Sequence, residues 1–229
     1  MTTEATATSR SPRLHRYSRG ARWLHALTYL ATAVELATGW WLLGGQEGHP
    51  SLLASLTSLP DTTIHVRVGI GLLVLALGGV ALAARSSWFL LRQSLLFRPS
   101  DVSWLRAWPR AAVTGDFGRH DGFFDPGQRV ANLVMLGGIA VLVGSGTGLA
   151  VLHGGDLFVA MLWLHKAATY IVTPVVAGHV VVASGVLPGY RGVWRSMHGG
   201  GGIDSGVAER LWPAWAERAK QAPADGGNP

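Results

Sequence analysis

Long apolar stretches, separated by polar and charged segments, dominate the pattern of this sequence. Four of them cover residues 23–43, 63–84, 130–152 and 157–187. Each reaches the length of about 20 residues that a helix needs to cross a bilayer. The pattern therefore predicts an all-α fold, an integral membrane four-helix bundle.

The composition agrees with a membrane protein. Of the 229 residues, 48% are apolar and only 14% are charged, whereas soluble domains usually carry about 25% charged residues. The first span has no small-residue cleavage site and is too long for a signal peptide, so we expect it to be retained.

The net charge of +6 is distributed as a topology signal rather than as a nucleic-acid footprint. Five arginines precede the first span, seven lie between the second and third spans, and five basic residues follow the fourth. The loops at residues 44–62 and 153–156 contain none. Because basic loops stay on the cytoplasmic side, we expect a multi-pass protein of the inner (cytoplasmic) membrane with both termini in the cytoplasm.

Three regions follow from this topology. Residues 1–18 are rich in Thr, Ser and Arg and are predicted to be a disordered tail. Residues 19–187 form the membrane domain, and residues 188–229 form a cytoplasmic C-terminal tail.

The chain has no cysteine. Iron–sulfur ligation, zinc–thiolate sites, disulfides and covalent haem attachment through C-x-x-C-H are therefore excluded for this chain.

Four histidines within the spans carry the candidate chemistry. His165 and His179 lie 14 residues apart in the fourth span, so they leave nearly the same helix face at levels about 21 Å apart. Topology pairs His179 with His25 toward the cytoplasm and His165 with His65 toward the outside. Each pair would bind one haem iron through both axial positions, which is typical of electron transfer. The alternative for any single histidine is a hydrogen-bonded packing residue.

Other polar groups near these levels have two interpretations. Arg19 and Arg22 would serve the propionates of the cytoplasmic haem, and Arg67 and Lys166 those of the outer haem; the alternative for Arg67 and Lys166 is snorkelling to the headgroups.

Glu35 lies near the middle of the first span, where an unpaired carboxylate is costly. It would relay protons or contact the outer haem region, unless it is a neutral acid hydrogen-bonded to a neighbouring span.

The arrangement resembles a known family. Its marks are Arg22-x-x-His25, His65 at the start of the second span, Gly127-Gln128-Arg129 before the third, and His165-x13-His179. Over about residues 19–220 the chain is similar to the cytochrome b (gamma) subunit of membrane-bound formate dehydrogenases, within the four-helix dihaem b-type cytochromes.

The resemblance implies that the four histidines ligate two haems b. It also implies a site for menaquinone or another quinone on the cytoplasmic side, near Asp125, Gly127, Gln128 and His179. This chain has Asp125-Pro126 where the family commonly has Asn followed by a small residue.

The resemblance further implies partners. Electrons would come from a molybdopterin catalytic subunit through an iron–sulfur subunit that docks on the outer loops, and this chain itself would carry no dehydrogenase chemistry. Alternatives are the b-type cytochrome of a nickel–iron hydrogenase or of another molybdopterin reductase, and, in a different class, a haem-free scaffold or proton-conducting bundle. The Gly127-Gln128-Arg129 stretch favours the formate type.

Overall fold

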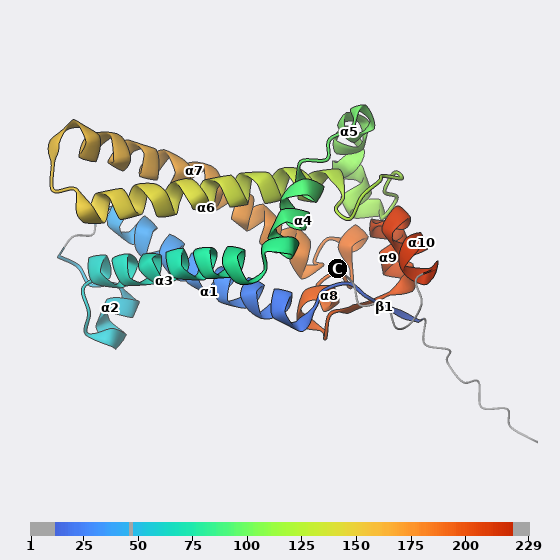
Figure 1. Cartoon of the computed structure of the whole chain (residues 1–229), viewed down its shortest axis with the longest axis horizontal. Coiled ribbons are helices and arrows are strands. Elements are labelled where there is room, and N and C mark those ends of the chain that lie inside the picture. The colour runs from blue at the N-terminus through green and yellow to red at the C-terminus, as the bar shows by residue number, and fades with distance from the viewer. Residues whose placement is uncertain (1–11, 46–47, 222–229) are drawn as a thin grey trace, which may run out of the picture.

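Four long helices run along the longest axis of the molecule (Figure 1). The computed structural model describes residues 12–45 and 48–221; most of the predicted disordered tail, 1–18, lies outside these residues. The long helices are α1 (Arg19–Leu43), α3 (Asp61–Leu82), α6 (Pro126–Val151) and α7 (Gly155–Ser184). The helical bundle predicted from the sequence is confirmed.

Local sequence signals define the ends of these helices. Ser18 caps α1, since its side chain accepts a hydrogen bond from the Ala21 backbone N–H. Asp125 caps α6 in the same way, with Pro126 at the first helical position. Gly185, at φ +74°, ends α7 in the left-handed conformation that glycine adopts without strain.

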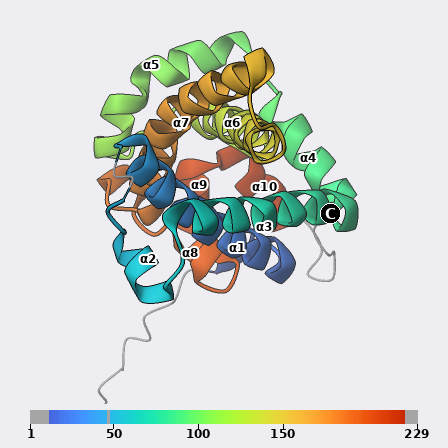
Figure 2. The ribbon, with the colours of Figure 1, turned by 90° about the vertical axis from the view of Figure 1, so that its left-hand side faces the viewer.

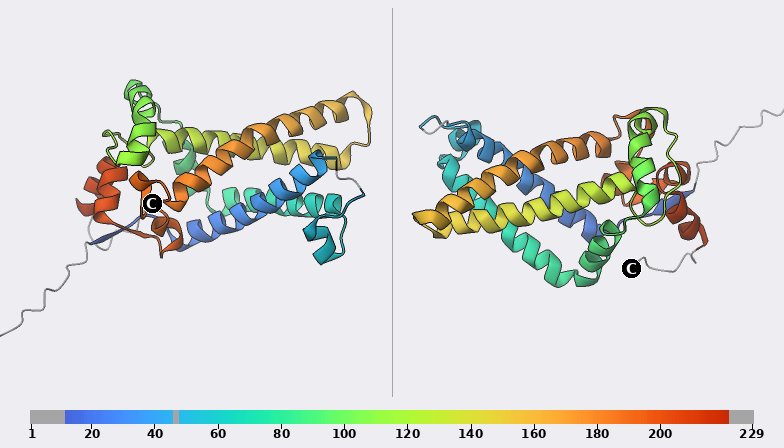
Figure 3. Two further views of the ribbon diagram at one scale, coloured as in Figure 1. Left: turned by 180° about the vertical axis from the view of Figure 1, so that it is seen from behind. Right: turned by 90° about the horizontal axis from the view of Figure 1, so that it is seen from above.

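The long helices form two antiparallel hairpins that face each other. In one, α1 packs against α3; in the other, α6 packs against α7, and contacts of α3 with α6 and of α1 with α7 join them (Figure 3). The second hairpin is close, because a side chain at Gly138 of α6 would collide with the buried Val172 of α7. The view along the bundle shows the hairpins as two layers (Figure 2).

Among the described residues, three helices are long and apolar enough to cross a membrane, namely α3, α6 and α7. The fourth, α1, has sufficient length with 25 residues, but it carries Glu35 in its middle. Many apolar side chains of the bundle are exposed, such as Leu82, Leu77 and Ile171, as expected of a surface in contact with lipid. The orientation of the termini stays a prediction.

The two ends of the bundle differ. We call the end with α2 (Leu52–Thr57) and the connection between α6 and α7 the turn end. We call the other end the tail end. It contains α5 (Pro99–Thr114), and α4 (Ala84–Ser94) leads to it from α3 (Figure 1). The remaining elements of the tail end are β1 (Arg13–His15), η1 (Pro188–Tyr190), α8 (Arg195–His198), β2 (Gly202–Asp204), α9 (Ser205–Leu211) and α10 (Pro213–Gln221).

Segments from the two ends of the sequence meet at the tail end. Strand β1 pairs antiparallel with β2, with Leu14 opposite Ile203. Next to it, the guanidinium of Arg16 is enclosed by aromatic rings and lies 3.6 Å from the centre of the Trp212 ring. The expectation of a disordered tail is therefore wrong for Arg13–His15, because this strand finds its partner almost 190 residues later in the chain.

Candidate functional site

The four span histidines lie in two pairs at the two ends of the bundle. At the tail end, the ring centres of His25 (α1) and His179 (α7) are 6.3 Å apart, with their planes at 57°. At the turn end, the ring centres of His65 (α3) and His165 (α7) are 6.0 Å apart, with their planes at 85°. The structure thus brings together the residues that the predicted topology pairs.

Both separations fit one metal ion between two imidazoles. A metal–imidazole bond is about 2 Å long, and a ring nitrogen lies about 1 Å from the ring centre, so rings on opposite sides of an ion have centres roughly 6 Å apart. In the described part of the chain, no group of three or more His, Cys, Asp or Glu side chains is placed to hold a metal. Each pair therefore suits an ion whose remaining ligands come from a cofactor, as in haem.

The turn-end histidines are held by hydroxyl groups. His65 Nδ1 lies 2.9 Å from Thr38 Oγ1 of α1, and His165 Nδ1 lies 3.0 Å from Ser145 Oγ of α6. Each hydroxyl residue comes from the other helix of the same hairpin. These bonds leave the Nε2 atoms of the rings available.

Glu35 belongs to the turn-end site. Its Oε2 lies 3.2 Å from His65 Nδ1, and Gly69 of α3 lies alongside the carboxylate, where an added side-chain carbon would make an ordinary contact of 3.6 Å with Oε2. The geometry places Glu35 beside the turn-end pair of His65 and His165.

The tail-end pair has different surroundings. His25 Nδ1 is buried, and no described residue forms a hydrogen bond with it. The rings of Tyr29 and His198 lie 5.7 Å and 6.2 Å from the His25 ring, centre to centre. Sequence reasoning assigned nothing to His198, because the spacing of a residue on a short helix after the last span gives no sign that it folds back onto α1.

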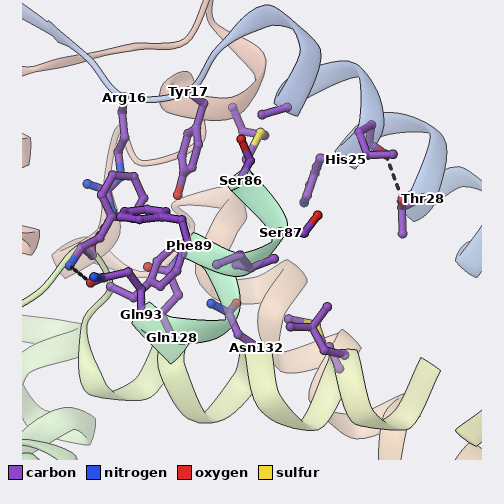
Figure 4. A pocket seen from close by; sticks show the side chains of 18 of the residues that line it. Arg16, Tyr17, His25, Thr28, Ser86, Ser87, Phe89, Gln93, Gln128 and Asn132 are labelled. Atoms are coloured by element: carbon purple, nitrogen blue, oxygen red, sulfur yellow. Dashed lines mark hydrogen bonds between the residues drawn. The ribbon is translucent and has the colours of Figure 1, made fainter. Parts of the chain in front are cut away.

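A cavity of about 2140 Å³ opens beside the tail-end pair. His25, His179 and His198 line it, and Gln128 and Asn132 of α6 project into it from the side opposite α1 (Figure 4). Most of its wall is apolar. Small-ligand pockets usually measure about 300–1,000 Å³, so this cavity has room for a cofactor and a second molecule.

The residues predicted to contact quinone separate into two groups. The Gln128 side chain lines the cavity, and its buried Oε1 has no hydrogen-bond partner among the described residues. Asp125 and Gly127 are not among the lining residues. The Asp125 carboxylate is instead used as the cap of α6 and accepts a 2.8 Å bond from the Gln128 backbone N–H.

The environment of Asp125 explains its role in the fold. Burial raises the pKa of its carboxyl, while the Gln128 N–H and the nearby positive charges oppose this rise. Gly127 lies against the Trp104 ring, which a side chain at this position would approach to 3.3 Å. Asp125 thus caps the first turn of α6, and Gly127 lets this turn pack against Trp104.

The predicted propionate partners have contacts of their own. Arg22 Nε donates to the Met197 carbonyl at 2.8 Å and ties α1 to α8, and it is not a lining residue of the cavity. At the turn end, Lys166 Nζ lies 5.8 Å from the centre of the Trp163 ring, while Arg67 lines a smaller pocket. Arg19 is exposed.

Comparison with known proteins gives one family. The sequence model described as prokaryotic cytochrome b561 matches residues 16–200, which include all four span histidines and His198. No curated protein matches the chain.

Proposed function

The chain belongs to the prokaryotic cytochrome b561 family, and on this premise we propose that it carries two haems b and passes electrons from a peripheral dehydrogenase to a quinone. Membership confirms the coarser part of the sequence prediction, a membrane b-type cytochrome of electron transfer. The number of haems, their ligands, the electron donor and the acceptor are the proposal.

The observation that carries the proposal is the presence of two histidine pairs at two levels of one bundle, each with ring centres about 6 Å apart. His25 and His179 hold one haem, and His65 and His165 hold the other. Haem b held in this way takes up and releases single electrons. With two histidines holding each haem, neither site would offer a position for oxygen.

The tail-end cavity supports a quinone site beside His25 and His179. Its largely apolar wall suits a lipid-soluble molecule, and a few polar groups, including the amide of Gln128, are available for the quinone oxygens. Menaquinone or another quinone of the membrane is the proposed acceptor.

The proposed donor is the iron–sulfur subunit of a formate dehydrogenase-type complex, whose catalytic subunit holds molybdopterin. The absence of cysteine leaves iron–sulfur chemistry to a partner. With both termini in the cytoplasm and the protein in the inner membrane, the turn end faces outward, and the loops at residues 44–62 and 153–156 form the docking surface.

The test is purification of the full chain from membranes in mild detergent, followed by haem analysis and identification of the subunits that remain bound. We expect two low-spin haems b per chain together with an iron–sulfur subunit. A chain that contains no haem would overturn the proposal in favour of a scaffold or a proton-conducting bundle. Two haems together with hydrogenase subunits would replace the donor while leaving the haem assignment intact.

A further inference from the structure

Each turn-end histidine contacts a hydroxyl residue and the glycine that follows it on a neighbouring helix. We call this two-residue arrangement the hydroxyl–glycine device. Thr38-Gly39 of α1 lies against His65 of α3, and Ser145-Gly146 of α6 lies against His165 of α7. In each case a hydroxyl residue contacts Nδ1 of the ring, and the glycine that follows lies beside the Cε1 atom. The device is thus present once in each hairpin.

The hydroxyl groups determine which ring nitrogen carries the proton. Thr38 Oγ1 donates its hydrogen to the Val34 carbonyl at 2.8 Å, and Ser145 Oγ donates to the Val141 carbonyl at 2.6 Å. Since a hydroxyl has a single hydrogen, each oxygen faces its histidine as an acceptor. The ring must therefore donate from Nδ1–H, and Nε2 is left unprotonated, as a metal ligand requires.

The glycines fix the position of each ring. A side-chain carbon at Gly39 would lie 3.3 Å from His65 Cε1, and one at Gly146 would lie 3.2 Å from His165 Cε1. Both distances are tighter than ordinary van der Waals contact, so each imidazole lies directly against the backbone of its neighbouring helix. Hydrogen bond and backbone contact together restrain the rotation of both rings, whose planes cross at 85°.

The tail-end pair lacks this arrangement at His25. Its Nδ1 atom is buried with no hydrogen-bond partner in the described part of the chain, and the tail-end rings cross at 57°. Among the described residues, the hydroxyl–glycine device is therefore present at both turn-end histidines and absent at His25.

We propose that Thr38 and Ser145 are positioning residues that hold the turn-end histidines in the iron-binding tautomer and with their ring planes crossed. The inference rests on the proposed function, in which these histidines hold a haem. A hydrogen bond from the second ring nitrogen raises the basicity of a histidine ligand. This stabilises ferric iron, so the two hydroxyls lower the reduction potential of the turn-end haem.

The decisive variant is Ser145→Ala in the haem-loaded full chain. We expect the midpoint potential of the turn-end haem to rise, and its low-spin ferric electron paramagnetic resonance signal to become less anisotropic, because the ring planes are free to leave the crossed orientation. The tail-end haem should keep its potential. Ser145→Thr retains the hydroxyl and should retain both properties of the unaltered protein.

The matched control is Thr147→Val on the same helix. Thr147 Oγ1 donates to the Val143 carbonyl at 2.8 Å in the same way as Ser145 does to Val141, but it is exposed. This substitution should leave both potentials and both signals unchanged. If Thr147→Val shifted the potential and the signal as much as Ser145→Ala does, the effect would come from a general disturbance of α6, and the proposal would be overturned.

Thr38→Val should act in the same direction with a smaller shift, because Glu35 Oε2 lies 3.2 Å from the same His65 nitrogen and also accepts. Thr38→Ser should restore the original potential. If Ser145→Ala loses only the turn-end haem while Ser145→Thr keeps it, the proposal is supported. If Ser145→Ala loses both haems, the midpoint potential and the electron paramagnetic resonance signal of Thr38→Val provide the test instead.

Unchanged potential and signal in a Ser145→Ala protein that keeps two haems would overturn the proposal. Loss of both haems in Ser145→Ala and in Thr38→Val would also overturn it, since the hydroxyls would then maintain the fold as a whole. These results differ from failure of the proposed function, which appears as missing haem in the unaltered chain.

Discussion

The two histidine pairs have nearly equal ring separations and very different surroundings. At the turn end, hydroxyls, glycines and Glu35 contact His65 and His165. At the tail end, His25 and His179 border a large cavity. The difference suggests a division of labour within one bundle: the packed pair suits electron transfer alone, and the open pair suits electron transfer to a substrate beside it.

The largest expected effect is the loss of quinone reduction in His25→Ala or His179→Ala. Each change would remove one of the two histidines proposed to hold the haem beside the cavity, so turnover should fall to background. The turn-end haem should still be reduced by the electron donor. The measurement combines quinone reduction with visible spectra of the donor-reduced protein, and unaltered quinone turnover in either variant would contradict the division of labour.

The packed pair should be sensitive to a single added methyl group. Gly146→Ala places a carbon 3.2 Å from His165 Cε1, so the ring must shift, and we expect partial loss or weakened retention of the turn-end haem. Gly144→Ala on the same helix is the control, because its added carbon would meet no described atom within 4 Å. Haem content per chain is the measurement; equal retention in the two variants would show that the ring is not held by the backbone contact.

The open pair should be sensitive to the polar group across the cavity. Gln128→Leu removes the unpartnered Oε1 atom while preserving a side chain of similar size. Loss of one hydrogen bond to the substrate is worth about 1–1.5 kcal/mol, or roughly tenfold. We therefore expect kcat/KM for quinone reduction to fall about tenfold, with both haem spectra intact. The measurement is steady-state kinetics with a soluble quinone analogue, and an unchanged kcat/KM would contradict a role for Gln128.

The smallest expected effect concerns Asp125. Its carboxylate caps α6 and is not a lining group of the cavity, so Asp125→Ala should lower the free energy of unfolding by about 1 kcal/mol. Asp125→Asn retains an accepting oxygen and should lose less. Thermal unfolding in detergent measures both changes. A raised KM for quinone in Asp125→Asn without a loss of stability would instead make Asp125 a quinone contact, as the family resemblance implied.

The sequence was informative where periodicity along one helix carries the signal. The 14-residue spacing of His165 and His179 put both rings on one face, and the distribution of arginines supplied the depth that pairs them with His65 and His25. These inferences need only helix geometry and the order of the spans. The structure brings the same pairs together.

Features that depend on helix rotation or on distant contacts were not accessible in this way. The contact of Thr38 with His65 is an example, because it is set by the rotation of α1 against α3. The β1–β2 pairing and the approach of His198 to His25 join segments more than 170 residues apart. A single sequence offers no pattern that specifies such contacts.

The pairing itself is tested most directly by redox titration of the visible spectra of four variants, His25→Ala, His65→Ala, His165→Ala and His179→Ala. Each substitution should remove, or convert to high spin, only the haem that its histidine holds. His25→Ala and His179→Ala should therefore lose one spectral component, and His65→Ala and His165→Ala the other. If His179→Ala lost the component that is missing in His65→Ala, the assignment of two haems to these two pairs would be wrong.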